Sequence, residues 1–241
     1  RTFAAAAAHL DAVAVSVDGD PATHDALRGR GAFARLDAGL HAVLAAGLPF
    51  GVIHTVQEDG AEALAWTARY AIDRGARLLQ LHPLEAVGRG AGLAGRVPGQ
   101  DALGRAYIAA SLIGASGRLR VQLDALHRAA LAREPAVAYA EDGPAAALPA
   151  DAIGTLVVQD DGRVSPIAYG LPARLAVAEL GHERLLEAWP RFAAERLPVL
   201  RALCRDLHAR ILADDALRLV PWTGLLVEAA QAQAPALVGA A

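Results

Sequence analysis

The segment Val15–Phe33 reads VSVDGDPATHDALRGRGAF, and it decides how the rest of the chain is interpreted. It opens on a β-branched run, which favours a strand, and the run stops at an Asp-Gly pair, a common turn signal. A loop with His24 and Asp25 follows, and then come Arg28, two glycines and an amphipathic pattern. The segment therefore predicts a strand, a turn-rich loop and the start of a helix.

Short apolar runs and helical patterns go on alternating on both sides of this segment. Strands are predicted at Val13–Val17, Val52–Val56 and Leu78–Leu81, and helices at 32–46 and 61–74. This rhythm is typical of βα units around a parallel sheet. Ligands of such sheets bind at the carboxyl ends of the strands. The polar residues that we expect there are Ser16, Asp18, His54, Thr55, Gln80 and His82.

In order and spacing, this part of the chain resembles the middle of the barrel in radical S-adenosylmethionine (radical SAM) enzymes. Their fourth strand and the loop after it commonly read S-x-D-G and then H-D-x-x-R-G, as residues 16–19 and 24–29 do here. The predicted strands FGVIHTV (50–56) and LLQLHPL (78–84) and the Gly88-Arg89-Gly90 run follow in the same order. The resemblance covers residues 1–90 and implies an α/β fold, a partial (β/α) barrel of the TIM type.

The resemblance also implies a binding site for S-adenosyl-L-methionine (AdoMet). Ser16 and Arg28 stand where the family contacts the methionyl carboxylate or the ribose, and a guanidinium can meet a carboxylate bidentately. Asp18 would reach the ribose or the substrate, and Leu84 ends the strand against which adenine packs. The plain alternatives are a tight strand position for Ser16, a solvated charge for Arg28, a turn residue for Asp18 and core packing for Leu84.

Radical SAM chemistry also needs three cysteine thiolates, usually C-x-x-x-C-x-x-C, to hold a 4Fe-4S cluster. This chain has one cysteine, Cys204. Since the chain starts at Arg1, lacks Met and opens on a helical pattern, we expect the cluster ligands upstream of residue 1. The intact protein would be an oxidoreductase that generates a 5′-deoxyadenosyl radical for hydrogen abstraction, with peptide or protein modification as the commonest task, whereas this chain alone would be inactive.

Composition narrows the choice of partners and compartment. The net charge of −3 and the pI near 6.2 give no basic footprint for nucleic acid. No apolar run is long enough for a membrane span. One cysteine gives no disulfide framework, so we expect a reducing cytoplasm. By analogy with the family, the partners would be an unidentified substrate, such as a peptide, and a reductant such as ferredoxin or flavodoxin.

The stretch AEDGPAAALPAD at 140–151 predicts a linker, because it is rich in Pro, Gly and Ala. We expect the barrel part at 1–139 and a small α+β extension at 152–241. Thr155–Gln159 and Arg163–Ile167 flank Asp161-Gly162, a two-residue hairpin signal. With Leu180-Gly181 and Trp189, the extension resembles the SPASM or twitch tail of radical SAM enzymes. There, cysteines ligate auxiliary clusters, but here Ile167 stands at the first cysteine position, so we expect no auxiliary cluster.

Two other interpretations stay open. A degenerate radical-SAM-like binding protein would keep the barrel and lose the cluster. An NAD-dependent oxidoreductase would depend on Gly90-x-Gly92-x-x-Gly95, which matches the dinucleotide fingerprint. Against it, Val97-Pro98-Gly99 stands where a helix should begin, and no acidic residue lies at the usual offset.

Three further residues, His24, Asp25 and Cys204, are of types that bind metals or react, but their sequence context argues against such roles. His24 and Asp25 resemble a metal-binding dyad in isolation, but no H-x-x-x-H or H-x-H spacing accompanies them, and we expect His24 to cap the loop through a hydrogen bond. Cys204 lies in a helical run and is expected to be a buried, inert thiol.

Overall fold

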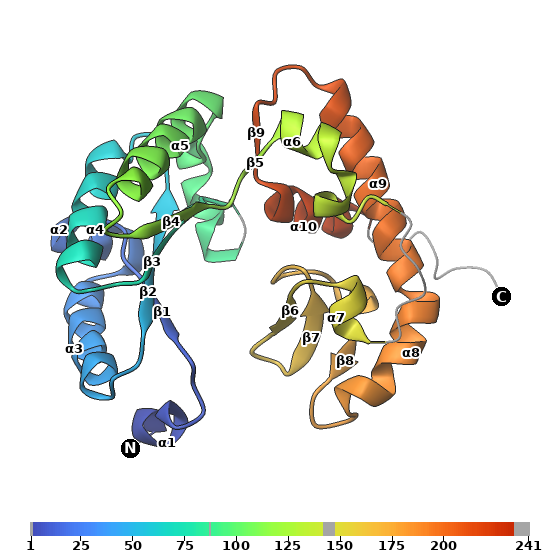
Figure 1. Ribbon diagram of the computed structural model, residues 1–241, viewed down its shortest axis with the longest axis horizontal. Helices are drawn as coiled ribbons and strands as arrows, with labels where there is room; N and C mark the ends of the chain where they lie inside the picture. The colour runs from blue at the N-terminus through green and yellow to red at the C-terminus, as the bar shows by residue number, and fades with distance from the viewer. Residues whose placement is uncertain (1, 87, 142–147, 234–241) are drawn as a thin grey trace. The chain divides into compact units, whose positions relative to one another are not determined.

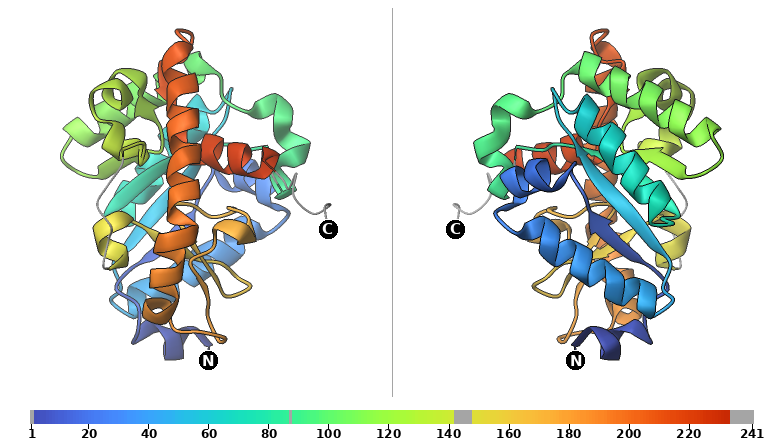
Figure 2. Two further views of the ribbon diagram at one scale, coloured as in Figure 1. Left: turned by 90° about the vertical axis from the view of Figure 1, so that its right-hand side faces the viewer. Right: turned by 90° about the vertical axis from the view of Figure 1, so that its left-hand side faces the viewer.

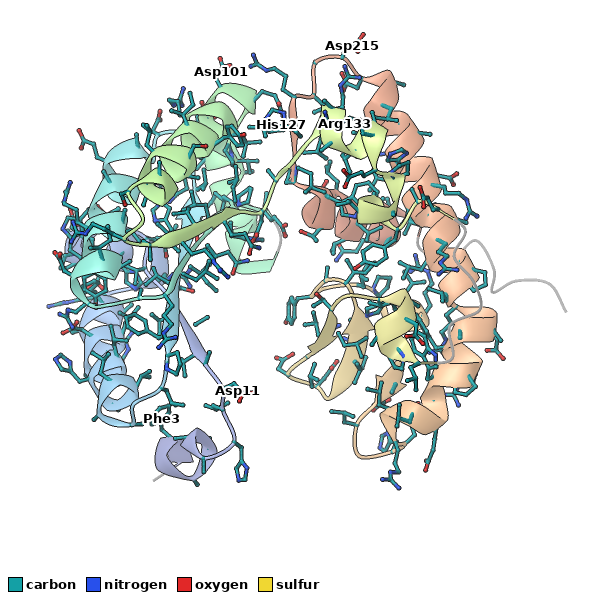
Figure 3. All side chains as sticks on the ribbon, in the orientation of Figure 1. Phe3, Asp11, Asp101, His127, Arg133 and Asp215 are labelled. Carbon is teal, nitrogen blue, oxygen red and sulfur yellow. The ribbon has the colours of Figure 1, made fainter. Side chains whose placement is uncertain are left out.

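The computed structural model describes residues 2–86, 88–141 and 148–233. The chain divides into two compact units, Arg1–Ala125 and Leu126–Ala241, each with its own apolar core (Figure 1). Their side chains are drawn in Figure 3, where Phe3 marks the first helix. Within the described ranges, no helix combines the length and the hydropathy that crossing a bilayer requires.

The first unit is built on a four-stranded parallel sheet whose strand order follows the chain, β1-β2-β3-β4. Its strands are β1 (Val13–Ser16), β2 (Phe50–Val56), β3 (Leu78–Pro83) and β4 (Arg120–Leu123). Its helices are α1 (Thr2–Ala7), α2 (Pro21–Arg28), α3 (Ala32–Ala45), α4 (Ala61–Asp73), the 3₁₀ helix η1 (Gly88–Arg96) and α5 (Gln100–Ala115). The predicted parallel sheet is therefore confirmed.

The connecting helices lie on one face of this sheet. Each crossover moves to the next strand in the same direction, so right-handed connections place every helix on the same side. Figures 1 and 2 show α3, α4 and α5 together on that side. A barrel wall has this one-sided arrangement, whereas the doubly wound sheet of dinucleotide-binding proteins has helices on both faces and the order 3-2-1-4.

The two faces of the sheet differ in polarity, because side chains alternate along a strand. Val52 and Leu79 face the helices across the register and are fully buried. The opposite face carries Ser16, Ile53 and Gln80 in one row across three strands, and these residues are only partly buried. The described strands form an open sheet with β1 and β4 at its edges, so the expected barrel is not closed by this part of the chain.

The boundary between the units lies between Ala125 and Leu126, ahead of the linker that the sequence predicted at 140–151. The reason is packing: α6 (Arg128–Arg133) and the 3₁₀ helix η2 (Pro135–Ala138) contribute Leu131 and Ala138 to the core of the second unit. Residues 142–147 of the expected linker lie outside the described residues.

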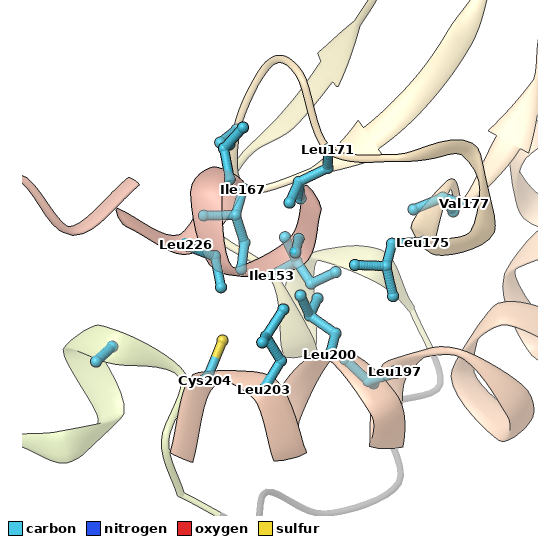
Figure 4. Close-up of a cluster of buried hydrophobic side chains, with 14 of the residues drawn as sticks. Ile153, Ile167, Leu171, Leu175, Val177, Leu197, Leu200, Leu203, Cys204 and Leu226 are labelled. Carbon is cyan, nitrogen blue, oxygen red and sulfur yellow. The ribbon is translucent and has the colours of Figure 1, made fainter. Parts of the chain in front are cut away.

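The second unit combines two small antiparallel sheets with helices. Its strands are β5 (Leu126–His127), β6 (Leu156–Val158), β7 (Arg163–Pro166), β8 (Ala178–Glu179) and β9 (Leu219–Val220), paired as β5-β9 and β6-β7-β8. Its other helices are α7 (Pro149–Ala152), η3 (Ala173–Leu175), α8 (Leu185–Glu195), α9 (Leu197–Ala213) and α10 (Trp222–Ala232). Residues of α8, α9 and α10 bury a common apolar core, part of which appears in Figure 4.

The predicted hairpin is present as β6 and β7, but its turn is longer than expected. The N–H of Gln159 donates to the carbonyl of Arg163 at 2.8 Å, which leaves residues 160–162 as a three-residue loop. Gly162 has φ +86°, the left-handed conformation that such loops place on glycine. The expected two-residue turn at Asp161-Gly162 is therefore wrong by one residue.

Candidate functional site

The turn after β1 needs glycine for two reasons. Gly19 has φ +124°, which side chains with a Cβ rarely adopt. A Cβ at this position would also lie 3.0 Å from Cγ2 of Thr23 and 3.1 Å from Cβ of Ala63. The Asp-Gly pair thus fixes how the chain leaves the carboxyl end of β1.

Asp18 ties this turn to the next strand and to α2. Its side chain is fully buried, and Oδ1 accepts a hydrogen bond from the N–H of Thr55 at 2.8 Å while Oδ2 accepts one from Nε of Arg28. Burial disfavours the charged carboxylate, but the Arg28 hydrogen bond and charge and the Thr55 N–H outweigh it and hold the pKa of Asp18 below its ordinary value. Both carboxylate oxygens are engaged, so contact of Asp18 with a ligand stays a prediction.

His24 closes the same loop from the other side. The backbone N–H of Asp18 donates to Nδ1 of His24 at 3.3 Å, which requires a neutral imidazole nitrogen as acceptor. Burial of the ring lowers the pKa of His24 and so favours that neutral form, although the nearby Asp18 charge opposes it. The predicted loop-capping role of His24 is confirmed.

Two further carboxylates of the motif cap helices. Asp20 accepts from the N–H of Thr23 at 2.8 Å, at the start of α2. Asp25 accepts from the N–H of Phe33 at 2.8 Å and of Gly31 at 2.6 Å, where α3 begins, and these bonds hold the pKa of Asp25 below its ordinary value. Its oxygens therefore satisfy backbone groups, and no cluster of metal-ligating side chains was found among the described residues.

Ser16 and Arg28, the two predicted contacts for the polar end of AdoMet, line one cavity beside the edge strand β1. Its volume is about 440 Å³, and its walls come from α1, β1, α2 and α3. Arg28 reaches Asp18 through Nε, and its side chain is 38% exposed. Its Nη groups have no carboxylate partner within the described chain, so they can meet an anionic group.

The carboxyl ends of β3 and β4 carry a hydrogen-bonded network on the face opposite the helices. Asp124, directly after β4, accepts from Nε2 of Gln80 at 2.6 Å through Oδ2 and from Nε2 of Gln122 at 3.0 Å through Oδ1. Nδ1 of His82 lies 3.1 Å from the same Oδ2, and its Nε2 lies 3.7 Å from Oε1 of Glu85. The network therefore fixes the orientation of the His82 ring.

The two titrating groups of this network, His82 and Asp124, have pKa values shifted in opposite directions. The hydrogen bond to Asp124 raises the pKa of His82, against the effect of burial, and Glu85 adds to the rise. Burial of Asp124 is outweighed by hydrogen bonds from His82, Gln80 and Gln122, so its pKa is lowered. The pair can hold and release a proton at the ring of His82, which is 39% exposed.

Sequence reasoning missed Asp124, although a signal was present. It is the first carboxylate after the alternating stretch Leu119–Leu123, whose pattern is typical of a strand, and the carboxyl ends of neighbouring parallel strands lie at one edge.

His54 does not belong to this edge in the way that the sequence suggested. It lies two residues from Val52 and from Val56 and so shares their face of the strand. It therefore faces the helices and is almost fully buried. Its Nδ1 lies 3.2 Å from the carbonyl of Val17 and 3.1 Å from Oγ1 of Thr67. The two-residue period of a strand explains the correction, because His54 and its neighbour Thr55 must point to opposite faces.

Leu84 lies at the expected place after β3, but little of it is accessible. Its side chain is 8% exposed, and its N–H donates to the carbonyl of Val56 at 2.9 Å. This geometry agrees with core packing, and contact with adenine stays a prediction.

The glycine run at Gly90–Gly95 does not form the phosphate cradle of a dinucleotide-binding protein. It lies in η1, and α5 begins only at Gln100, after Val97-Pro98-Gly99. The N–H of Gly99, at the start of α5, donates to Oε2 of Glu58 at 2.7 Å. The helix start is therefore separated from the glycines and already has an internal carboxylate, which argues against the NAD-dependent alternative.

The cysteine content does not fit a 4Fe-4S cluster. Cys204 is fully buried in the core of the second unit, as predicted, and burial raises the pKa of its thiol to about 12 (Figure 4). Ile167, which we predicted to replace the first cysteine of a SPASM-like tail, packs in the same core. A cluster needs several thiolates, and the sequence contains one cysteine.

Comparison with known proteins yields structural relatives only. No family model and no curated protein matches the sequence. A structure of native anSMEcpe with bound AdoMet is similar over 92% of this chain and 66% of that chain, with a TM-score of 0.51 and 14% identity. A structure of hexahistidine-tagged anSMEcpe with bound AdoMet is similar over 96% of this chain and 70% of that chain, with a TM-score of 0.53 and 13% identity.

The chain thus spans about two thirds of the length of these relatives, and at such identity the likeness concerns the fold. The fold of this chain, a mixed α/β arrangement with a parallel four-stranded sheet, is similar to that of anSMEcpe solved with AdoMet bound.

Proposed function

We propose that this chain forms the AdoMet-binding part of a radical SAM enzyme, with the cofactor on the polar face of the parallel sheet near its carboxyl edge. The observation that carries this proposal is the row of hydrogen-bonding side chains on the face opposite the helices, from Ser16 on β1 to Gln80 and His82 on β3. Support comes from a fold shared with a protein that was solved with AdoMet bound.

The spacing of the polar groups suits a cofactor with several polar groups of its own. Ser16 and Gln80 are aligned through Ile53, so they stand two strand spacings apart, roughly 10 Å. One AdoMet molecule offers a carboxylate, ribose hydroxyls and an adenine amine over such a distance. The hydroxyl of Ser16 would bind the ribose or the carboxylate, and the Nη groups of Arg28 would bind the carboxylate.

The radical step needs a group for which this chain has no ligands. In radical SAM enzymes, a reduced 4Fe-4S cluster cleaves AdoMet to a radical that abstracts hydrogen from a substrate. Since Cys204 alone cannot hold this cluster, we assign no such step to the residues of this chain. Hydrogen abstraction, a peptide substrate and a ferredoxin or flavodoxin reductant are proposed only for a protein or assembly that supplies the three cysteines.

A second candidate is a binding protein that keeps the fold and has no radical chemistry. The single, fully buried cysteine favours it. Both candidates bind AdoMet, and iron analysis separates them. An assembly that contains this chain and takes up about four irons per chain after anaerobic reconstitution supports the enzyme, and one that takes up none supports the binding protein.

Calorimetric titration of the chain with AdoMet tests the proposed site. We expect saturable binding, and Ser16→Ala should weaken it by about fivefold, since a neutral hydroxyl contributes about 1 kcal/mol. Arg30→Ala is the matched control, because Arg30 is exposed in the same loop and outside the network of Asp18. Equal affinities of Ser16→Ala and Arg30→Ala, or the absence of saturable binding, would show that the site is misplaced.

A further inference from the structure

The first unit contains another cavity, on the helix-covered side of the sheet and away from the proposed AdoMet face. It has a volume of about 430 Å³ and lies between α4 and α5 above β2. Most of its walls are apolar, with Leu64, Ala68 and Ile72 from α4 and Ala106, Ala109 and Ile113 from α5. The alanines leave the space between the helices unfilled, so the cavity can take an apolar body.

One end of this cavity holds a buried polar atom without a partner. Gln57, after the carboxyl end of β2, is 5% exposed, and its Oε1 has no hydrogen bond within the described chain. A buried acceptor left in this state destabilises the fold, and such atoms are rare in folded proteins. Because Gln57 lines the cavity, an O–H or N–H group of a bound molecule can supply the missing hydrogen bond.

Among the charged residues that line the cavity, arginines outnumber the one carboxylate, Glu58. Arg69, Arg105 and Arg118 all line it. Arg105 has Glu58 as a partner, with 3.6 Å between Nη2 and Oε1. Arg69 and Arg118 are exposed and have no carboxylate partner among the residues that the structure describes. Two guanidinium groups are therefore available to an anion.

The topology separates these groups along the cavity. Gln57 follows β2 at the carboxyl edge of the sheet, while Arg118 precedes β4 at the amino edge. The lining residues of α4 run from Ala61 to Ile72, which corresponds to roughly 16 Å along the helix axis. On α5, Leu112 lines the cavity and is 70% exposed, so the apolar surface continues to the rim.

We propose that this cavity binds an elongated amphipathic anion. Its apolar body would pack between α4 and α5, its carboxylate or phosphate would meet Arg118 and Arg69, and a hydroxyl or N–H group at its far end would donate to Oε1 of Gln57. The charge of the guanidinium groups selects an anion over a neutral or cationic chain. Water leaves the apolar walls on binding, which provides the main driving force.

Titration with 12-hydroxydodecanoate and with dodecanoate, both below the concentrations at which they form micelles, tests this proposal by calorimetry. We expect one molecule per chain and about fivefold tighter binding of the hydroxylated probe, because only it can satisfy Gln57. Gln57→Leu should abolish this preference. Arg118→Gln should weaken both probes by about threefold, and added salt should do the same. Dodecyltrimethylammonium, with the opposite charge, should not bind.

Ala109→Phe fills the cavity and serves as the blocking variant, with Ala65→Phe as a second choice if the first fails to fold. The expected result is loss of probe binding with unchanged circular dichroism and unchanged AdoMet titration, which keeps this test independent of the proposed function. The proposal is overturned if neither probe binds saturably, if both bind equally well, or if the Phe variant binds them as the unchanged chain does.

Discussion

Replacing Arg28 by Ala should destabilise the first unit, because it removes the only charged hydrogen-bond donor of the buried Asp18 carboxylate in the described structure. Breaking a fully buried ion pair costs about 3–5 kcal/mol. Here the side chain of Arg28 is 38% exposed, so water can replace part of the lost solvation. The N–H of Thr55 also remains as a donor. We therefore expect a loss of about 2 kcal/mol in the free energy of unfolding at pH 7.

Urea unfolding, followed through the NMR signals of β2 amides, measures this loss within the first unit. Arg30→Ala should change the stability by less than about 0.5 kcal/mol. Because Arg28 and Asp18 form an ion pair, the double-mutant cycle of Arg28→Ala with Asp18→Asn should give a coupling energy of about 1 kcal/mol or more. Stability equal to that of Arg30→Ala, or strictly additive losses in the cycle, would refute the assignment of Arg28 as the partner that stabilises Asp18.

The pH dependence has a defined sign. The folded-state pKa of Asp18 is lowered, so its contribution to stability is complete above the ordinary pKa of about 3.9 and is lost as the pH falls through the lower folded value. The difference between Arg28→Ala and the unchanged chain should therefore shrink in acid. A difference that stays constant down to the acid transition would contradict a charged Asp18.

Three further outcomes are expected. Asp124→Asn should lower the pKa of His82 in an NMR titration, and an unchanged His82 pKa would argue against the network. The accompanying loss of stability should be largest below about pH 6.5 and should fade as the pH rises through the folded pKa of His82. Gly19→Ala should cost about 1–3 kcal/mol in urea unfolding, because alanine rarely adopts φ +124° and its Cβ would lie only 3.0–3.1 Å from Thr23 and Ala63, and a neutral effect would mean that the turn rearranges freely. The Cys204 thiol should react with iodoacetamide only in denaturant, since burial raises its pKa to about 12, and rapid labelling of the folded chain would place it outside the core.

Regular elements could be predicted because their signal is local. The apolar, β-branched pattern predicted a strand at Val52–Val56, and the observed strand, Phe50–Val56, has the bounds of the stretch that carries the family resemblance. The same two-residue period places His54 on the helix side, a consequence that the list of strand-end residues overlooked. The loop motif was likewise found, but the sequence could not show that Asp18 and Arg28 bind each other.

What the sequence did not reveal depends on contacts between distant residues. Asp124 joins Gln80 and His82, which precede it by 44 and 42 residues, and no periodicity connects such positions. The unit boundary lies before Leu126, because Leu131 packs into the core of the second unit. The linker was predicted later in the chain, at 140–151, from its Pro/Ala/Gly composition alone. Composition shows where a chain can turn, and packing decides to which unit a helix belongs.

Amide chemical shifts of the chain, followed during an AdoMet titration, show whether the polar face of the parallel sheet binds AdoMet. We expect saturable shifts for Ser16, Thr55 and Gln80 at the carboxyl edge, with the signals of the cavity residues Ala68 and Ala109 unchanged. Shifts confined to other surfaces, or no shifts at millimolar AdoMet, would contradict it.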